Sequence, residues 1–163
     1  MLKKCENCGN TFEAREEYYK LCNECNKKRQ YNKGESKEEL PLNLLLKTYF
    51  DEKGDLVKEI FLDIPEQLAK KFYQNGLRMK QLRDFYHVIS AARTSALLKG
   101  MAAVRPSLWQ CITKLEYQLK RGIVPKSFVS FMKHHLVLAE RDEKYLDAFY
   151  QHLDSIVCYF PKQ

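Results

Sequence analysis

Apolar residues recur at spacings of three and four along the last hundred residues, which is the period of an amphipathic helix. Glycine and proline interrupt this pattern and predict helix ends. Five helices are expected, over about residues 63–74, 79–99, 106–121, from Pro125 onward, and 142–160. Asp63 is expected to cap the first of them, with Pro65 in its first turn. Five such helices with short connections favour a compact bundle, so the predicted fold class is mainly α.

The residues before this pattern differ in character. Two short apolar runs, residues 43–50 and 55–62, flank the turn Asp51–Gly54, and this arrangement predicts a β-hairpin. Residues 26–40 are charged and nearly free of apolar side chains, as in a linker. The expected organisation is a small module over residues 1–28, a linker with the hairpin over 29–62, and the bundle over 63–163.

Composition sets the class of the protein. The 163 residues are 45% apolar and 12% aromatic, which is typical of a folded domain. No apolar run approaches the ~18 residues of a membrane span, and the charged start does not resemble a secretory signal. We therefore expect a cytoplasmic protein without a membrane partner, in which cysteines stay reduced.

Four of the six cysteines form two Cys-x-x-Cys pairs, Cys5/Cys8 and Cys22/Cys25. Two such turns can complete a tetrahedral thiolate shell around Zn²⁺, so residues 3–28 are interpreted as a zinc ribbon or knuckle. Two short strands, at Thr11-Phe12 and Tyr18-Tyr19, would lie between the pairs. An iron–sulfur cluster also uses four thiolates, and the spacing leaves both open. The two remaining cysteines, Cys111 and Cys158, are expected to be buried apolar thiols.

A shell of four thiolates has no open position for a substrate, so the predicted site is structural. Residues 1–40 carry nine Lys or Arg against eight Asp or Glu, and a four-thiolate zinc site would make this module slightly negative. Its charge therefore favours protein docking over nucleic-acid binding.

The net charge of +7 is concentrated in one segment. Residues 71–126 hold eleven Lys or Arg and two acids, whereas a solvated surface usually mixes both signs. Helical geometry, at about 100° per residue, places several of these cations opposite the apolar faces of the second and third helices. This basic face predicts contacts with RNA phosphates, and the residues expected to make them are Lys80, Arg83, Lys114, Tyr117 and Arg121.

No catalytic constellation accompanies this surface. The four histidines, His87, His134, His135 and His152, fit no nucleophile or metal motif and are expected at the surface or in helix caps. The glycines lie at helix ends and turns, so no nucleotide-binding loop is expected. The sequence therefore predicts a binding subunit rather than an enzyme.

Three segments resemble the small subunit of the type III-A CRISPR effector, the Csm complex. They are Gln81-Leu82-Arg83-Asp84-Phe85-Tyr86, the run from Leu115 to Arg121, and the aromatic helix from Tyr145 to Tyr159. The resemblance covers roughly residues 62–163. It implies a non-catalytic helical bundle whose copies stack along crRNA and target RNA beside other Csm subunits in antiviral defence. Self-association is part of the same expectation.

Two alternatives stay open at this stage. A zinc-ribbon regulator that binds nucleic acid would carry its basic residues in the ribbon, which is nearly neutral here. The small subunit of the Cmr-type complex is also helical, but it has a different signature in its second helix.

Overall fold

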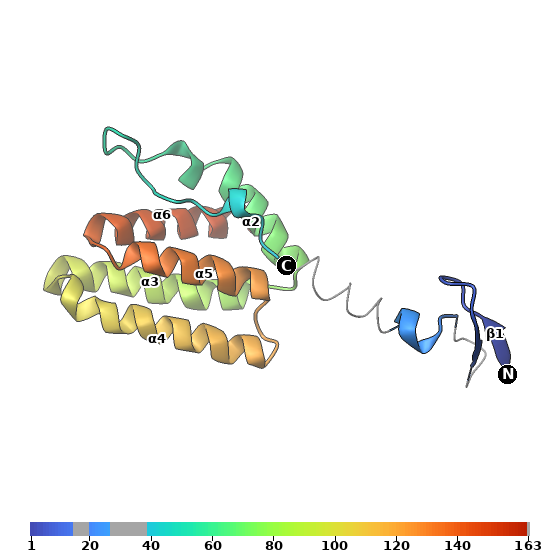
Figure 1. The fold of residues 1–163 in the computed structure, drawn as a ribbon. Coiled ribbons are helices and arrows are strands. Elements are labelled where there is room, and N and C mark those ends of the chain that lie inside the picture. Colours follow the sequence, from blue (N-terminus) through green and yellow to red (C-terminus); the bar gives the residue numbers. More distant parts are fainter. Residues whose placement is uncertain (15–19, 27–38, 163) are drawn as a thin grey trace. The chain divides into compact units, whose positions relative to one another are not determined.

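The computed structural model describes residues 1–14, 20–26 and 39–162 of the 163-residue chain. Two compact units make up the chain, Met1–Glu39 and Leu40–Gln163 (Figure 1).

The N-terminal unit is built on a two-stranded antiparallel sheet. Strand β1 (Leu2–Lys4) pairs with β2 (Thr11–Glu13), so that Lys3 lies opposite Phe12. Gly9 turns the chain between them with a φ of 75°, a value that glycine adopts at little cost. The strand predicted at Thr11-Phe12 is confirmed, whereas Tyr18-Tyr19 lie outside the described residues. Residues 23–26 are helical.

The second unit is the helical bundle that the hydrophobic pattern predicts. Its helices are α2 (Asp63–Gln74), α3 (Met79–Lys99), α4 (Met101–Lys120), α5 (Lys126–Ala139) and α6 (Glu143–Tyr159). Helix α6 packs against α2, α3 and α5, while α4 packs against α3 and α5 (Figure 1). Helix α4 therefore lies on one side of the bundle, and its outer face is left to solvent.

Aromatic rings fill the centre of the bundle. Phe72, Phe85, Phe128, Phe131 and Phe149 are all fully buried. The Phe72 ring lies 5.3 Å from that of Phe128 and 5.4 Å from that of Phe131, both in edge-on geometry. Burial of each such side chain contributes about 1.5–3 kcal/mol, so these rings stabilise the bundle without the N-terminal unit.

The predicted hairpin at residues 43–62 is reduced to a single bridge between Phe50 and Leu56. The turn itself is present, with Gly54 at a φ of 83°. Its flanks are the 3₁₀ helices η1 (Leu42–Leu44) and η2 (Lys58–Ile60) instead of strands. Tyr49 and Ile60 are fully buried in the core of the bundle, so packing against the helices determines the path of this segment.

Two expected helix starts are wrong by a few residues. Helix α2 includes Asp63 as its first residue, and Leu62 takes the capping position. Helix α4 begins at Met101, so Pro106 lies inside it. Val104 is buried in line with the apolar residues that follow, and burial of that extra turn offsets the one hydrogen bond that proline removes.

The two isolated cysteines differ. Cys111 is buried, as predicted, and burial raises the pKa of its thiol to about 11. Cys158 is exposed, so the prediction of a buried thiol there is wrong. It lies in the last turn of α6, on the side of the helix away from the buried Ile156 and Phe160.

Candidate functional site

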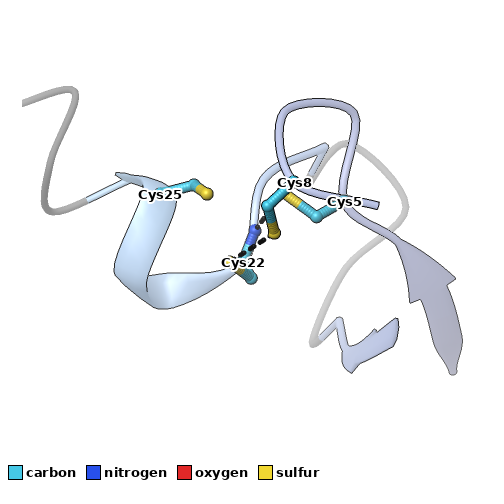
Figure 2. A group of neighbouring side chains, drawn as sticks. All are labelled: Cys5, Cys8, Cys22 and Cys25. Atoms are coloured by element: carbon cyan, nitrogen blue, oxygen red, sulfur yellow. Dashed lines mark hydrogen bonds between the residues drawn. The ribbon is translucent and has the colours of Figure 1, made fainter. Parts of the chain in front are cut away.

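Four cysteine sulfurs meet in the N-terminal unit (Figure 2). One Sγ atom from each of Cys5, Cys8, Cys22 and Cys25 lies within 4.8 Å of the other three. Cys5 and Cys8 belong to the turn after β1. Cys22 lies just before the short helical segment, and Cys25 lies within it. The two halves of the cluster thus come from segments about fifteen residues apart in sequence.

Hydrogen bonds hold two of these sulfurs in place. The backbone N–H of Cys22 donates to Cys5 Sγ at 3.3 Å, and Asn7 Nδ2 donates to Cys25 Sγ at 3.4 Å. The N–H of Cys22 is the main cause that lowers the pKa of Cys5 to about 6, helped by the N–H groups of Cys8 and Asn7 and opposed by burial. Donors aimed at sulfur favour the thiolate, which is the form that binds a metal.

The donor set fits a single ion. Zinc–sulfur bonds of about 2.3 Å in a tetrahedron place neighbouring sulfurs about 3.8 Å apart. The sulfurs of Cys8 and Cys22 are 3.8 Å apart, and all four are close enough to share one centre. Among the described residues no other group of cysteines, histidines and carboxylates is close enough to bind a metal.

The bundle carries the second candidate site, on the outer face of α3 and α4. All five residues predicted to contact RNA are exposed: Lys80, Arg83, Lys114, Tyr117 and Arg121. Helices α3 and α4 run antiparallel because Gly100 alone connects them, with a φ of 83°. The start of α3 therefore lies beside the end of α4, and the five residues share this end of the helix pair.

One contact sets the register of the two helices. The Nζ atom of Lys114 lies 5.4 Å from the ring centre of Phe85 on α3. One turn further along the pair, Lys80 and Arg83 come level with Tyr117 and Arg121.

Some of these side chains already have hydrogen-bond partners within the protein, and others have none in the described part of the chain. Arg121 donates from Nη1 to the Tyr117 hydroxyl at 3.1 Å, and its guanidinium lies 5.5 Å from the ring centre. Neither Lys80 nor Arg83 has an ion-pair partner among the described residues. An unpaired, exposed cation is available for a phosphate at little desolvation cost.

Other cations of the basic segment serve the fold. Arg93 is paired with Asp147 of α6, and its guanidinium lies 4.5 Å from the Tyr150 ring centre. Arg105 donates to the backbone carbonyl of Glu140 at 2.9 Å. The charge of Glu116 is balanced by an ion pair with Lys133 at 2.6 Å, and the hydrogen bond from Lys133 lowers the pKa of the carboxyl group, so that it stays ionised.

The histidines contradict the surface and capping roles expected for them, except for the exposed His87. His135 and His152 are fully buried. Nδ1 of His135 is 2.6 Å from the hydroxyl of Tyr49, and Nδ1 of His152 donates to the Ile60 carbonyl at 2.9 Å. The half-buried His134 donates from Nε2 to the Leu46 carbonyl at 2.6 Å.

These three bonds attach residues 46–60 to the bundle. The sequence contained one signal for them that was missed, namely three histidines at core spacings on two apolar helices. Each needs a buried partner, and the preceding segment provides it.

None of the helices in the described part of the chain has both the length and the apolar character that a membrane crossing requires.

The bundle and its exposed basic face define a small all-α subunit. The family model Csm2 Type III-A matches residues 55–162, and the chain belongs to this family. It is therefore a small subunit of the type III-A CRISPR effector complex and associates with other Csm subunits. No curated protein and no solved structure matches the chain. The match leaves out residues 1–54, which include the cysteine cluster and Tyr49.

Proposed function

We propose that this subunit binds crRNA and its target RNA through the outer face of α3 and α4. The observation that carries the proposal is the position of the five residues Lys80, Arg83, Lys114, Tyr117 and Arg121. All are exposed, all lie at one end of the helix pair, and the surrounding segment has eleven cations against two acids.

The chemistry of this face favours backbone contacts. Lysine and arginine donate to phosphate oxygens, which carry no sequence information, while the Tyr117 ring offers a surface for stacking. Binding should therefore be independent of sequence and strongly dependent on salt, because phosphate contacts release counterions. One subunit makes few contacts, so copies that stack along one guide–target duplex would bind it far more tightly.

Charge reversal tests this face directly. Lys80→Glu, Lys114→Glu and Arg121→Glu should each weaken RNA binding by the full-length chain and reduce the salt slope by about one. Arg141→Glu and Lys144→Glu are matched controls, since Arg141 lies just before α6 and Lys144 in its first turn, at the far end of the α3–α4 pair. Fluorescence anisotropy with two unrelated RNA sequences, at several salt concentrations, measures both quantities. If the controls weaken binding and the first set does not, the RNA surface lies elsewhere on the bundle.

We also propose that Cys5, Cys8, Cys22 and Cys25 hold one Zn²⁺ with a structural role. The spacing of the four sulfurs supports a single ion, and the four ligands leave no position for a substrate. Elemental analysis of the purified chain should find one zinc per molecule. If the chain absorbs visible light and the analysis finds iron, the site holds an iron–sulfur cluster instead of zinc. If the analysis finds neither metal, the proposed site is refuted.

We infer that the subunit is non-catalytic and acts in the cytoplasm. The family consists of structural components of the effector, and one ring nitrogen each of His134 and His152 is bonded to a backbone carbonyl of the chain itself. RNA or DNA cleavage that persists through purification and disappears in His134→Ala would contradict this inference.

A further inference from the structure

Two glutamine side chains on the bundle carry an enclosed oxygen without a partner. The Oε1 atoms of Gln81 on α3 and Gln118 on α4 are shielded from solvent and make no hydrogen bond, although both residues are half-buried. Most enclosed polar atoms in native proteins are paired, because an unpaired one costs about 1–3 kcal/mol. Two such atoms on neighbouring helices therefore require an explanation.

The register of the helices brings the two glutamines together. Gln81 lies one turn before Phe85, and Gln118 lies one turn after Lys114, the residue whose Nζ atom is 5.4 Å from the Phe85 ring. Because α3 and α4 are antiparallel, one turn back along α3 and one turn forward along α4 lead towards the same end of the helix pair. The two carboxamides are thus level with each other at the α3–α4 seam, and Lys80 and Arg121 lie next to them in sequence or one turn along.

The cations around these amides have no acceptor atom. Lysine and arginine are donors only, and the Tyr117 hydroxyl already accepts from Arg121 at 3.1 Å. A carboxamide is both a donor and an acceptor, and rotation of its last torsion exchanges the two positions. Asp84 also has acceptor oxygens on this stretch, but its negative charge repels the phosphates on either side of a nucleotide.

A ribose 2′-hydroxyl is likewise both donor and acceptor, and it is the group that distinguishes RNA from DNA. Between two phosphates that are held by Lys80 and Arg121, the 2′-hydroxyl can donate to a glutamine Oε1 and accept from an Nε2–H. Deoxyribose provides neither interaction. Because both Oε1 atoms are enclosed in the free protein, binding requires the carboxamide to turn its oxygen to the surface, where that oxygen would then be paired.

We propose that Gln81 and Gln118 form a ribose-recognition pair that makes the basic face selective for RNA. This inference rests on the proposed function, since it assumes that the α3–α4 face binds nucleic acid. It assigns selectivity to the glutamines and overall affinity to the cations.

The test compares three duplexes of one sequence: RNA, fully 2′-O-methylated RNA and DNA. The methylated duplex keeps the A-form shape but has no hydroxyl donor, so it separates shape from 2′-hydroxyl recognition. The full-length chain is measured by fluorescence anisotropy at fixed low salt. Gln81→Leu and Gln118→Leu remove the amides with little change in size, and the exposed Gln110→Leu on α4 is the matched control.

The natural chain should bind RNA at least about fivefold more tightly than the methylated duplex, as expected for one hydrogen bond. In Gln81→Leu and Gln118→Leu this ratio should fall towards one, while DNA affinity stays unchanged. Gln110→Leu should keep the full ratio. Thermal unfolding should be unaffected in all three variants, because none removes a partnered group.

Each other outcome is decisive. If Lys80→Glu and Arg121→Glu weaken binding to all three duplexes but the leucine variants keep the natural ratio, the ribose pair is wrong and the RNA face stands. The ribose pair is also wrong if Asp84→Asn removes the preference instead. If the natural chain binds none of the duplexes, the proposed function fails and the ribose pair fails with it.

Discussion

Because two histidines are buried in the bundle, we predict that the bundle loses stability below neutral pH. Burial lowers the pKa of His135 well below its ordinary value, and the neighbouring His152 and His134 add to this. Burial also lowers the pKa of His152 from 6.5 to about 4, although its bond to the Ile60 carbonyl acts in the opposite direction. The His152 ring is therefore neutral in the folded bundle above about pH 5, and burial favours the neutral form of His135 as well.

The sign of the effect follows from proton binding. Below pH 6.5 the unfolded chain takes up protons on these residues that the folded chain excludes, so acid favours unfolding. Stability is complete above pH 6.5 and falls progressively towards pH 4. For His152 alone the loss is about 3 kcal/mol in full and about 2 kcal/mol at pH 5. His135 acts in the same direction, and a domain of ordinary stability has only about 5–15 kcal/mol to lose.

Urea unfolding at pH 7.5 and pH 5.0, followed by circular dichroism at 222 nm, measures this loss. A chelator at both pH values keeps metal release from the N-terminal unit out of the comparison. His152→Asn keeps a donor for the Ile60 carbonyl and removes the titrating ring. It should be less stable at pH 7.5 because it leaves a cavity, but it should lose about 2 kcal/mol less than the natural chain on acidification.

His87→Asn is the matched control, because His87 is exposed. It should lose as much stability on acidification as the natural chain does. Other groups that titrate near pH 5 are common to all three proteins and cancel in the comparison. If the natural chain and His152→Asn lose the same free energy between the two pH values, His152 is not held neutral by burial and the reasoning is refuted.

Further predictions concern the metal unit, the core, one turn and the thiols. Cys22→Ser should abolish metal binding in elemental analysis and leave the 222 nm signal of the bundle nearly unchanged. Phe131→Ala should lower the free energy of unfolding by about 3–5 kcal/mol in urea titrations, since the ring is fully buried. Gly100→Ala should cost about 1–3 kcal/mol by the same measurement, because its φ of 83° and ψ of 168° strain any other residue, while no atom lies within 4 Å of the added Cβ. In the folded, metal-loaded chain a maleimide should label Cys158 rapidly and Cys111 only on unfolding, as intact-mass and peptide mapping will show.

Local patterns were sufficient for the helices and for the cysteine cluster. The apolar spacing repeats over many turns in each helix, so the five helices were predicted with errors of only a few residues at α4 and α2. The Cys-x-x-Cys pairs depend on turns of four residues, and the structure brings all four sulfurs within 4.8 Å. Both signals act over short distances along the chain, which is why the sequence alone reveals them.

Contacts between distant segments were not predictable in this way. Tyr49 and His135 are 86 residues apart, and no periodicity relates them. The same contacts bury Tyr49 and Ile60, and this burial replaces the expected hairpin by 3₁₀ turns.

The basic face combines both kinds of information. The sequence by itself determined that eleven cations and two acids occur in residues 71–126, and that five named residues lie on outer helix faces. Only the tertiary structure decided which cations are free, because Arg93 pairs with Asp147 across α3 and α6. It also decided that Gln81 and Gln118 are level, since the single-residue turn at Gly100 sets the register of α3 and α4. Helical periodicity tells on which side of its own helix a residue lies. Which residues of two neighbouring helices lie opposite each other depends on how the helices pack and on the length of the connection between them.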